Sequence, residues 1–158
     1  MKDPFDEQIR DYTLGGIDGI TVSLALLSGL VASGKDIHVI VLGGIISTLS
    51  GALSMGLGDY LAIDSVKDRK DVAYLSAMRV FFGYLVASSV PLVAYIFIKD
   101  VKSAFKISLF MSAVALVIFG YIRAKLLNDV VSISVGKTLA IGATTFGITY
   151  QVSKVIPV

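Results

Sequence analysis

The sequence has no cysteine and few charged residues, and both shortages exclude whole classes of protein. Without cysteine, the chain can form neither a disulfide framework nor a thiolate metal site. Charged residues make up 16% of the 158 positions and hydrophobic residues 55%, whereas soluble domains are about 25% charged. The net charge is only +2, and the basic residues lie between apolar runs, which argues against a nucleic-acid partner. These shortages predict a polytopic membrane protein that contacts the lipid bilayer.

Five charge-poor runs account for most of the chain. Since a spanning helix needs about 20 mostly apolar residues, they predict five transmembrane helices at about 13–33, 37–63, 79–98, 105–123 and 136–153. We therefore expect one all-α transmembrane domain over 1–158, with no soluble domain. The polar N-terminal segment lacks the features of a signal peptide, so the first span is expected to act as its own insertion signal.

The distribution of basic residues predicts how the spans are oriented. Nine Lys and Arg residues fall on the side of the N-terminus and five on the other side. By the positive-inside rule, this favours a cytosolic N-terminus and a C-terminus on the opposite side.

The spans differ in composition. The third and fourth are rich in Phe, Val, Leu and Ile, which is typical of lipid-facing scaffold. The first and second each carry a face of small residues, which permits close approach in lipid, so we expect these faces to meet each other or a partner subunit. The connection at 62–79 has apolar residues at helical spacing and is interpreted as an extension of the second helix or a short surface helix.

Asp18 is the only ionisable residue in the apolar run at 14–33. A carboxylate inside a spanning helix costs several kcal/mol and commonly marks an ion pathway. The alternative is a structural role, in which Asp18 is capped or reaches water near the end of the helix.

Met55 and Asp59 on the second span fall in the same half of the bilayer as Asp18. At 1.5 Å per residue, Asp18 lies roughly 7–8 Å from the inner boundary, Asp59 roughly 6 Å and Met55 roughly 12 Å. Two carboxylates alone would suit Mg²⁺ or Ca²⁺, while a thioether adds preference for a transition ion such as Fe²⁺. We therefore take Asp18, Met55 and Asp59 as candidate metal ligands. Thr21 and Gly51 are candidates for lining the pathway, and Glu7 and Asp11 for first contact with ions on the cytosolic side.

Two segments resemble the vacuolar iron transporter family. At the first span, Arg10-Asp11 precedes the apolar run and is followed by Asp18-Gly19-Ile20-Thr21-Val22 and then by Ala25-Leu26 and Gly29-Leu30. In the second, the run from Gly51 to Tyr60, GALSMGLGDY, is similar to the family's Gly-Ala-x-Ser-Met-x-x-Gly-Glu-Tyr/Phe signature. The resemblance extends over almost the whole chain.

The resemblance implies a homodimer of five-helix subunits that moves Fe²⁺, and often Mn²⁺, out of the cytosol in exchange for protons. It also implies that Asp18 and Met55 line a pathway between the subunits. A metal ion and a proton would then compete for the two Asp18 side chains, which would face each other in the dimer. The resemblance further implies the cell membrane as its location in a prokaryote, or a vacuolar-type membrane in a eukaryote. Two departures stand out. The family's signature glutamate is Asp59 here, and only about twenty residues replace the cytosolic metal-binding domain that eukaryotic members carry between the second and third helices.

Two classes of function follow. The first is a secondary transporter with Fe²⁺ or Mn²⁺ as the transported ion and no resident cofactor. The second is a non-transporting membrane assembly protein in which Asp18 is a buried packing residue. An enzyme is not expected, because no nucleophile–base pair or histidine–glutamate metal set occurs at any interface.

Overall fold

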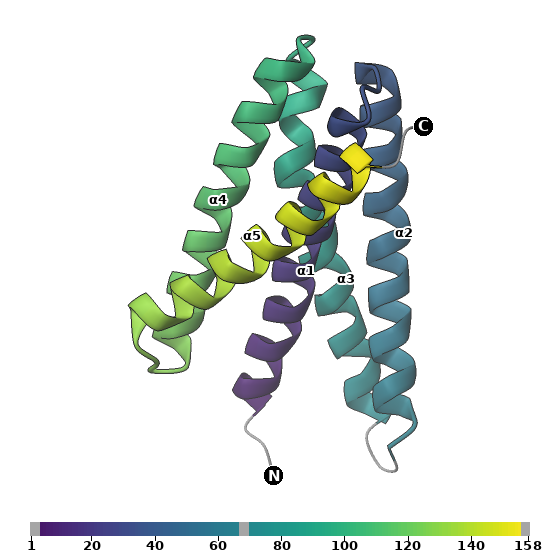
Figure 1. Cartoon of the computed structure of the whole chain (residues 1–158). Helices are drawn as coiled ribbons and strands as arrows, with labels where there is room; N and C mark the ends of the chain where they lie inside the picture. Colours follow the sequence, from purple (N-terminus) through teal and green to yellow (C-terminus); the bar gives the residue numbers. More distant parts are fainter. Residues whose placement is uncertain (1–3, 67–69, 156–158) are drawn as a thin grey trace.

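Five helices make up the described part of the chain. The computed structural model describes residues 4–66 and 70–155. Its helices are α1 (Pro4–Ala32), α2 (Ile37–Asp64), α3 (Lys70–Phe97), α4 (Val101–Leu126) and α5 (Val131–Val155), and no strand occurs in these ranges. All five are long and apolar enough to cross a membrane, which confirms the predicted all-α multi-pass membrane protein. The helices form a bundle in which α5 crosses α1 at an angle (Figure 1).

The connection at 62–79 departs from the sequence prediction. α2 ends at Asp64 and α3 begins at Lys70, so most of this stretch is the first part of α3. It is therefore neither an extension of the second helix nor a separate surface helix. The helix runs on into the third span because no proline or glycine interrupts residues 70–82.

α3 is the helix on which both α1 and α2 pack, while α1 and α2 touch each other less (Figure 1). Its buried residues recur along the helix at Ala73, Ala77, Val80, Tyr84, Ala87 and Leu92. The prediction that the third span is lipid-facing scaffold is therefore wrong. An apolar side chain suits lipid and a helix interface equally, so composition could not distinguish the two.

Two glycines of α1 let this helix approach the backbone of α3. A Cβ atom on Gly19 would lie 2.7 Å from the carbonyl oxygen of Tyr84, and one on Gly15 would overlap the carbonyl oxygen of Val80. This part of the small-residue face was predicted to meet the second span or a partner subunit, but it meets α3 instead. A run of small residues indicates that a helix can be approached closely, not which helix approaches it.

Aspartate side chains cap two helices at their N-termini. Asp36 accepts hydrogen bonds from the backbone N–H groups of Val39 at 3.1 Å and His38 at 2.8 Å, and Asp100 accepts one from Ser103 at 2.9 Å. The hydrogen bonds from Val39 and His38 lower the pKa of the Asp36 carboxyl, and those from Ser103 lower the pKa of Asp100. Both aspartates lie in short connections and are exposed, so their role is to begin helices.

Candidate ion site

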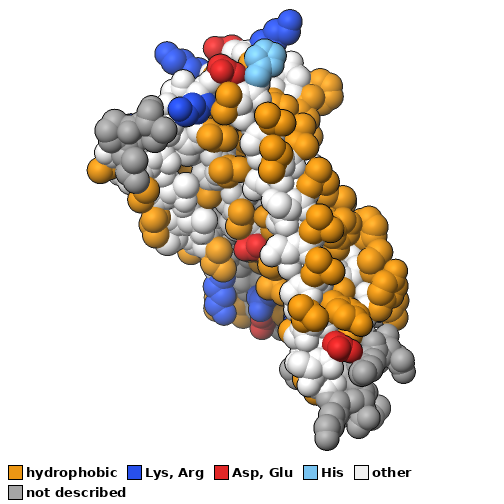
Figure 2. All heavy atoms as spheres, turned by 90° about the vertical axis from the view of Figure 1, so that its right-hand side faces the viewer, with side chains coloured by type: hydrophobic (Ala, Val, Ile, Leu, Met, Phe, Trp, Pro, Cys, Tyr) orange, Lys and Arg blue, Asp and Glu red, His pale blue; other side chains and the backbone are white. Residues whose placement is uncertain are grey.

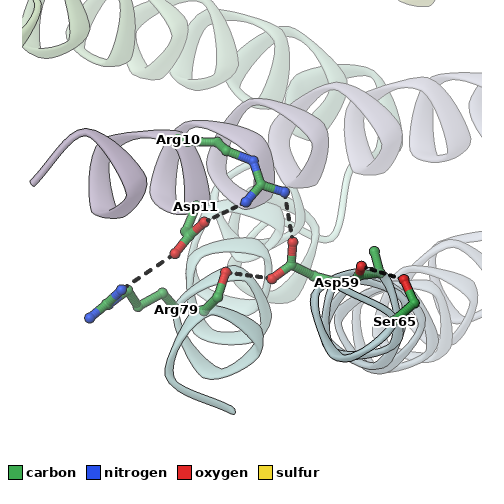
Figure 3. A network of polar contacts seen from close by, with 7 residues as sticks. Arg10, Asp11, Asp59, Ser65 and Arg79 are labelled. Atoms are coloured by element: carbon green, nitrogen blue, oxygen red, sulfur yellow. Dashed lines mark hydrogen bonds and ion pairs between the residues drawn. The ribbon is translucent and has the colours of Figure 1, made fainter. Parts of the chain in front are cut away.

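A cluster of charged residues joins α1, α2 and α3 toward the end of the bundle where α1 begins (Figure 3). Arg10 donates to Asp59 Oδ1 at 2.9 Å and also lies 3.4 Å from Asp11, while Arg79 approaches the other oxygen of Asp11 at 3.4 Å. The Ser76 hydroxyl donates to Asp59 Oδ2 at 2.5 Å. We call these residues the Arg–Asp cluster: Arg10, Asp11, Asp59, Ser76 and Arg79.

Both carboxylates of the Arg–Asp cluster are shielded and paired. The side chain of Asp11 is 0% exposed and that of Asp59 is 3% exposed. A buried carboxylate is stable only with a charged or hydrogen-bonding partner, and the arginines and Ser76 provide these. In this conformation Arg10 therefore engages both carboxylates, including that of Asp59, a candidate metal ligand in the sequence.

Asp18 has a different environment. It lies seven residues after Asp11 on α1, about 10 Å further along the helix axis. The residue is half-buried, and no hydrogen bond or ion pair reaches its carboxylate from the described residues. Ionisable residues within membrane spans normally pair with one another or face a functional cavity. Asp18 is thus a carboxylate inside a span for which residues 4–66 and 70–155 provide no partner.

Gly51 and Met55 lie on the part of α2 that is nearest to the level of Asp18 along the bundle. A Cβ atom on Gly51 would overlap the hydroxyl oxygen of Tyr84, whose backbone packs against the glycines on either side of Asp18. Gly51 is therefore at the level of Asp18. Met55 is half-buried one turn closer to Asp59, about 6 Å away from it along the helix axis. The structure thus brings Gly51 to the level of Asp18, places Met55 next along α2, and sets Asp59 apart in the Arg–Asp cluster.

The remaining candidates lie along α1. Thr21 is buried, and its hydroxyl donates to the carbonyl oxygens of Ile17 at 2.9 Å and Asp18 at 3.2 Å. Because its own helix uses the hydroxyl proton, Thr21 can offer an ion only its lone pairs. Glu7 is half-buried and lies one helical turn before Asp11, on the same side of α1.

Three residues of α3 belong to these levels but were missed in the sequence. Ser76 and Arg79 share a helix face three residues apart, a signal hidden because the stretch was interpreted as a connection. Tyr84 was visible only as part of a Gly-Tyr-Leu motif. Placing them required knowing that α3, rather than α2, is the main neighbour of α1.

The surface between the two ends of the bundle is largely apolar. Figure 2 shows hydrophobic side chains covering this part of the view, with lysine, arginine and most acidic side chains gathered toward the ends. An acidic side chain is visible within the apolar region. Among residues 4–66 and 70–155, no group of three or more His, Asp or Glu residues could hold a metal ion. A single chain therefore does not offer, in its described part, a complete carboxylate or histidine ligand set.

Comparison with known proteins gives one family. The model of the VIT family matches residues 9–73 and 66–154. Vacuolar iron transporter 1 of Oryza sativa subsp. japonica is 24% identical over 95% of this chain and 86% of its own length, and vacuolar iron transporter 1 of Tulipa gesneriana is 26% identical over 94% and 87%. Protein CCC1 of Saccharomyces cerevisiae is 27% identical over 75% of this chain and 58% of its own length.

The alignments also indicate where the chain is short. Those with the rice and tulip proteins extend over 216 and 214 positions, although this chain has 158 residues, so the relatives carry additional residues within the matched region. The two segments of the family match overlap at 66–73, which includes the end of the connection between α2 and α3 and the first residues of α3. A short connection stands at that junction here.

Proposed function

The chain belongs to the VIT family, and from this premise we propose that it transports a divalent transition-metal ion, with Fe²⁺ as the main cargo, out of the cytosol. The observation that carries the proposal is the Asp18 carboxylate, which lies inside a span and has no partner among the described residues. Relatives named vacuolar iron transporter support iron as the metal.

The working unit we propose is a homodimer with cytosolic N-termini. One subunit contributes too few ligands in its described part, whereas two copies of Asp18 and Met55 would supply two carboxylates and two thioethers. The nine-to-five distribution of basic residues supports the orientation.

The exchange of metal for protons is the next part of the proposal. Two carboxylates that face each other in a poorly solvated path repel when both are charged, and either a proton or a divalent cation relieves that repulsion. Metal binding from one side would therefore release protons, and protons from the other side would release the metal. Mn²⁺ is a second cargo in this scheme, while Met55 favours Fe²⁺ because a thioether contributes little to hard ions.

The test is metal-driven proton movement in liposomes containing purified protein. Asp18→Asn keeps the shape of the side chain and removes its charge, so it should reduce Fe²⁺ flux and the accompanying proton movement to the level of empty liposomes. Asp100→Asn is the matched control, because it removes a carboxylate outside the spans and asparagine caps a helix equally well. Coupled flux at the wild-type rate in Asp18→Asn would instead favour an assembly role for Asp18.

A further inference from the structure

Tyr84 is a buried residue of α3 to which the transport proposal gives no role. It is 2% exposed, and its backbone packs against Gly15 and Gly19, the glycines of α1 on either side of Asp18. Its side chain extends to α2, where a Cβ atom on Gly51 would overlap its hydroxyl oxygen. Tyr84 therefore crosses the interior between α1 and α2 at the level of Asp18.

The Tyr84 hydroxyl has no hydrogen-bond partner within residues 4–66 and 70–155. A phenol hydroxyl is a hydrogen-bond donor, and tyrosine hydroxyls in protein interiors usually have a partner. Asp18, an acceptor that also has no partner among these residues, lies on α1 between Gly15 and Gly19, the two glycines against which the Tyr84 backbone packs. The Tyr84 hydroxyl, a donor, and the Asp18 carboxylate, an acceptor, thus lie at the same level of the bundle. Neither has a hydrogen-bond partner among the described residues.

We propose that Tyr84 is a positioning residue for Asp18: its hydroxyl donates a hydrogen bond to the carboxylate and orients it toward the metal ion. Gly51 belongs to the same arrangement, because any side chain at this position would occupy the place of the hydroxyl. The metal ion in this account rests on the proposed function. The hydrogen bond can be tested without transport.

The kinetic test compares Tyr84→Phe with Tyr95→Phe. Loss of a hydrogen bond to a charged group should raise the KM for Fe²⁺ about tenfold in Tyr84→Phe, with a much smaller change in maximal rate. Tyr95 is the matched control because it is a buried tyrosine of the same helix whose hydroxyl also has no partner among the described residues. The nearby Ser108 hydroxyl donates instead to the Pro91 carbonyl at 2.8 Å. Tyr95→Phe should leave the KM unchanged.

A second pair of variants tests the space for the hydroxyl. Gly51→Ala should raise the KM in the same direction as Tyr84→Phe, because the added methyl group displaces the Tyr84 side chain. Gly43→Ala is its control on α2, since a Cβ atom there would meet only the end of the Leu30 side chain, at 3.1 Å.

Infrared difference spectra of the purified protein provide a readout independent of transport. The Asp18 carboxyl band is identified by its loss in Asp18→Asn, and Tyr84→Phe and Gly51→Ala should shift it while Tyr95→Phe does not. An unshifted band in Tyr84→Phe, or equal KM changes in Tyr84→Phe and Tyr95→Phe, would overturn the positioning role. If wild-type protein moves no metal but the band shifts, the transport proposal fails and the hydrogen bond stands.

Discussion

Two levels of the bundle hold carboxylates inside the spans, and their surroundings differ. In the Arg–Asp cluster, Asp11 and Asp59 are almost completely shielded, and both are paired with arginine. About 10 Å further along α1, Asp18 is more exposed and has no partner among the described residues. The same helix, α3, contributes side chains to both levels.

The difference separates two roles for an acidic residue in a membrane protein. A paired and buried carboxylate stabilises the packing of the helices that hold its partners, and it is poorly placed to bind a cation while an arginine occupies its oxygens. An unpaired carboxylate contributes little to packing and leaves its oxygens available. We therefore expect variants at the Arg–Asp cluster to change stability first and variants at the Asp18 level to change ion handling first.

The largest effect on stability is expected at Arg10. Arg10→Leu removes a partner from two buried carboxylates, and breaking a buried ion pair costs about 3–5 kcal/mol. Because the Arg10 side chain is 51% exposed, we expect the low end, about 3 kcal/mol, in unfolding measured in detergent. Arg123→Leu is the control, since its carboxylate partner Asp129 is 51% exposed and lies 3.6 Å away, and its other contact is the uncharged Ser134 hydroxyl at 3.2 Å. That pair should contribute less than about 1 kcal/mol. Equal stability of both variants would contradict a structural role for the cluster.

A smaller loss of stability is expected for a substitution where α1 packs against α3. In Gly19→Ala the new methyl group would lie 2.7 Å from the Tyr84 carbonyl oxygen, so the helices must separate, at a cost of about 1–3 kcal/mol. Gly147→Ala adds the same methyl group to α5, where no atom of the described residues outside its own helix turn lies within 4 Å, and should be neutral or slightly stabilising because alanine favours helix. If Gly19→Ala is as stable as Gly147→Ala, then α1 and α3 are less closely packed than the structure shows.

Met55 lies between the two levels, and its substitution should change selectivity rather than stability. Met55→Ala removes a soft ligand, so Fe²⁺ flux should fall severalfold while any weak leak of Mg²⁺ or Ca²⁺ stays constant. The measurement is flux of each ion in liposomes with matched amounts of protein. Proportional loss for hard and soft ions would make Met55 a packing residue.

The smallest effect on stability is expected at Asp36, a carboxylate that has hydrogen-bond partners but is exposed. Because hydrogen bonds lower its pKa in the folded state, its stabilisation is present above the ordinary carboxyl pKa and is lost as pH falls through the lowered value. Asp36→Asn keeps the cap without the charge, so it should remove this acid-dependent part of stability while leaving neutral-pH stability nearly unchanged. An unaltered acid profile in Asp36→Asn would show that the cap does not depend on the charge.

The number of spans and the position of Asp18 as an isolated carboxylate within one of them could be predicted from the sequence, because both rest on where charge is rare. Apolar length alone locates the spans, and a single aspartate within one of them is conspicuous. The partner of each helix could not be predicted. Small-residue faces on the first two spans suggested that they meet, whereas Gly15, Gly19 and Gly56 all pack against α3.

The role of Asp59 illustrates the same limit. Its spacing from Met55 places Asp59 at a plausible depth in the bilayer for a metal ligand. Spacing along one helix does not, however, indicate which cation from another helix lies beside the carboxylate. In the structure that cation is Arg10, which comes from α1. The second contact of Asp59, Ser76, comes from a part of α3 that was interpreted in the sequence as a connection. Long-range pairing of charged residues depends on the packing of all three helices.

The account is tested most directly by the stabilisation that a metal ion gives to purified protein. Ion binding to the folded state raises the free energy of unfolding by about 2.7 kcal/mol at roughly 100 times the dissociation constant, and Mn²⁺ serves as an air-stable probe. We predict that Mn²⁺ stabilises the wild-type protein and that Asp18→Asn unfolds like the wild type without metal but gains almost nothing from Mn²⁺. Equal stabilisation of Asp18→Asn and wild type by Mn²⁺ would contradict the assignment of Asp18 as the ion-binding carboxylate.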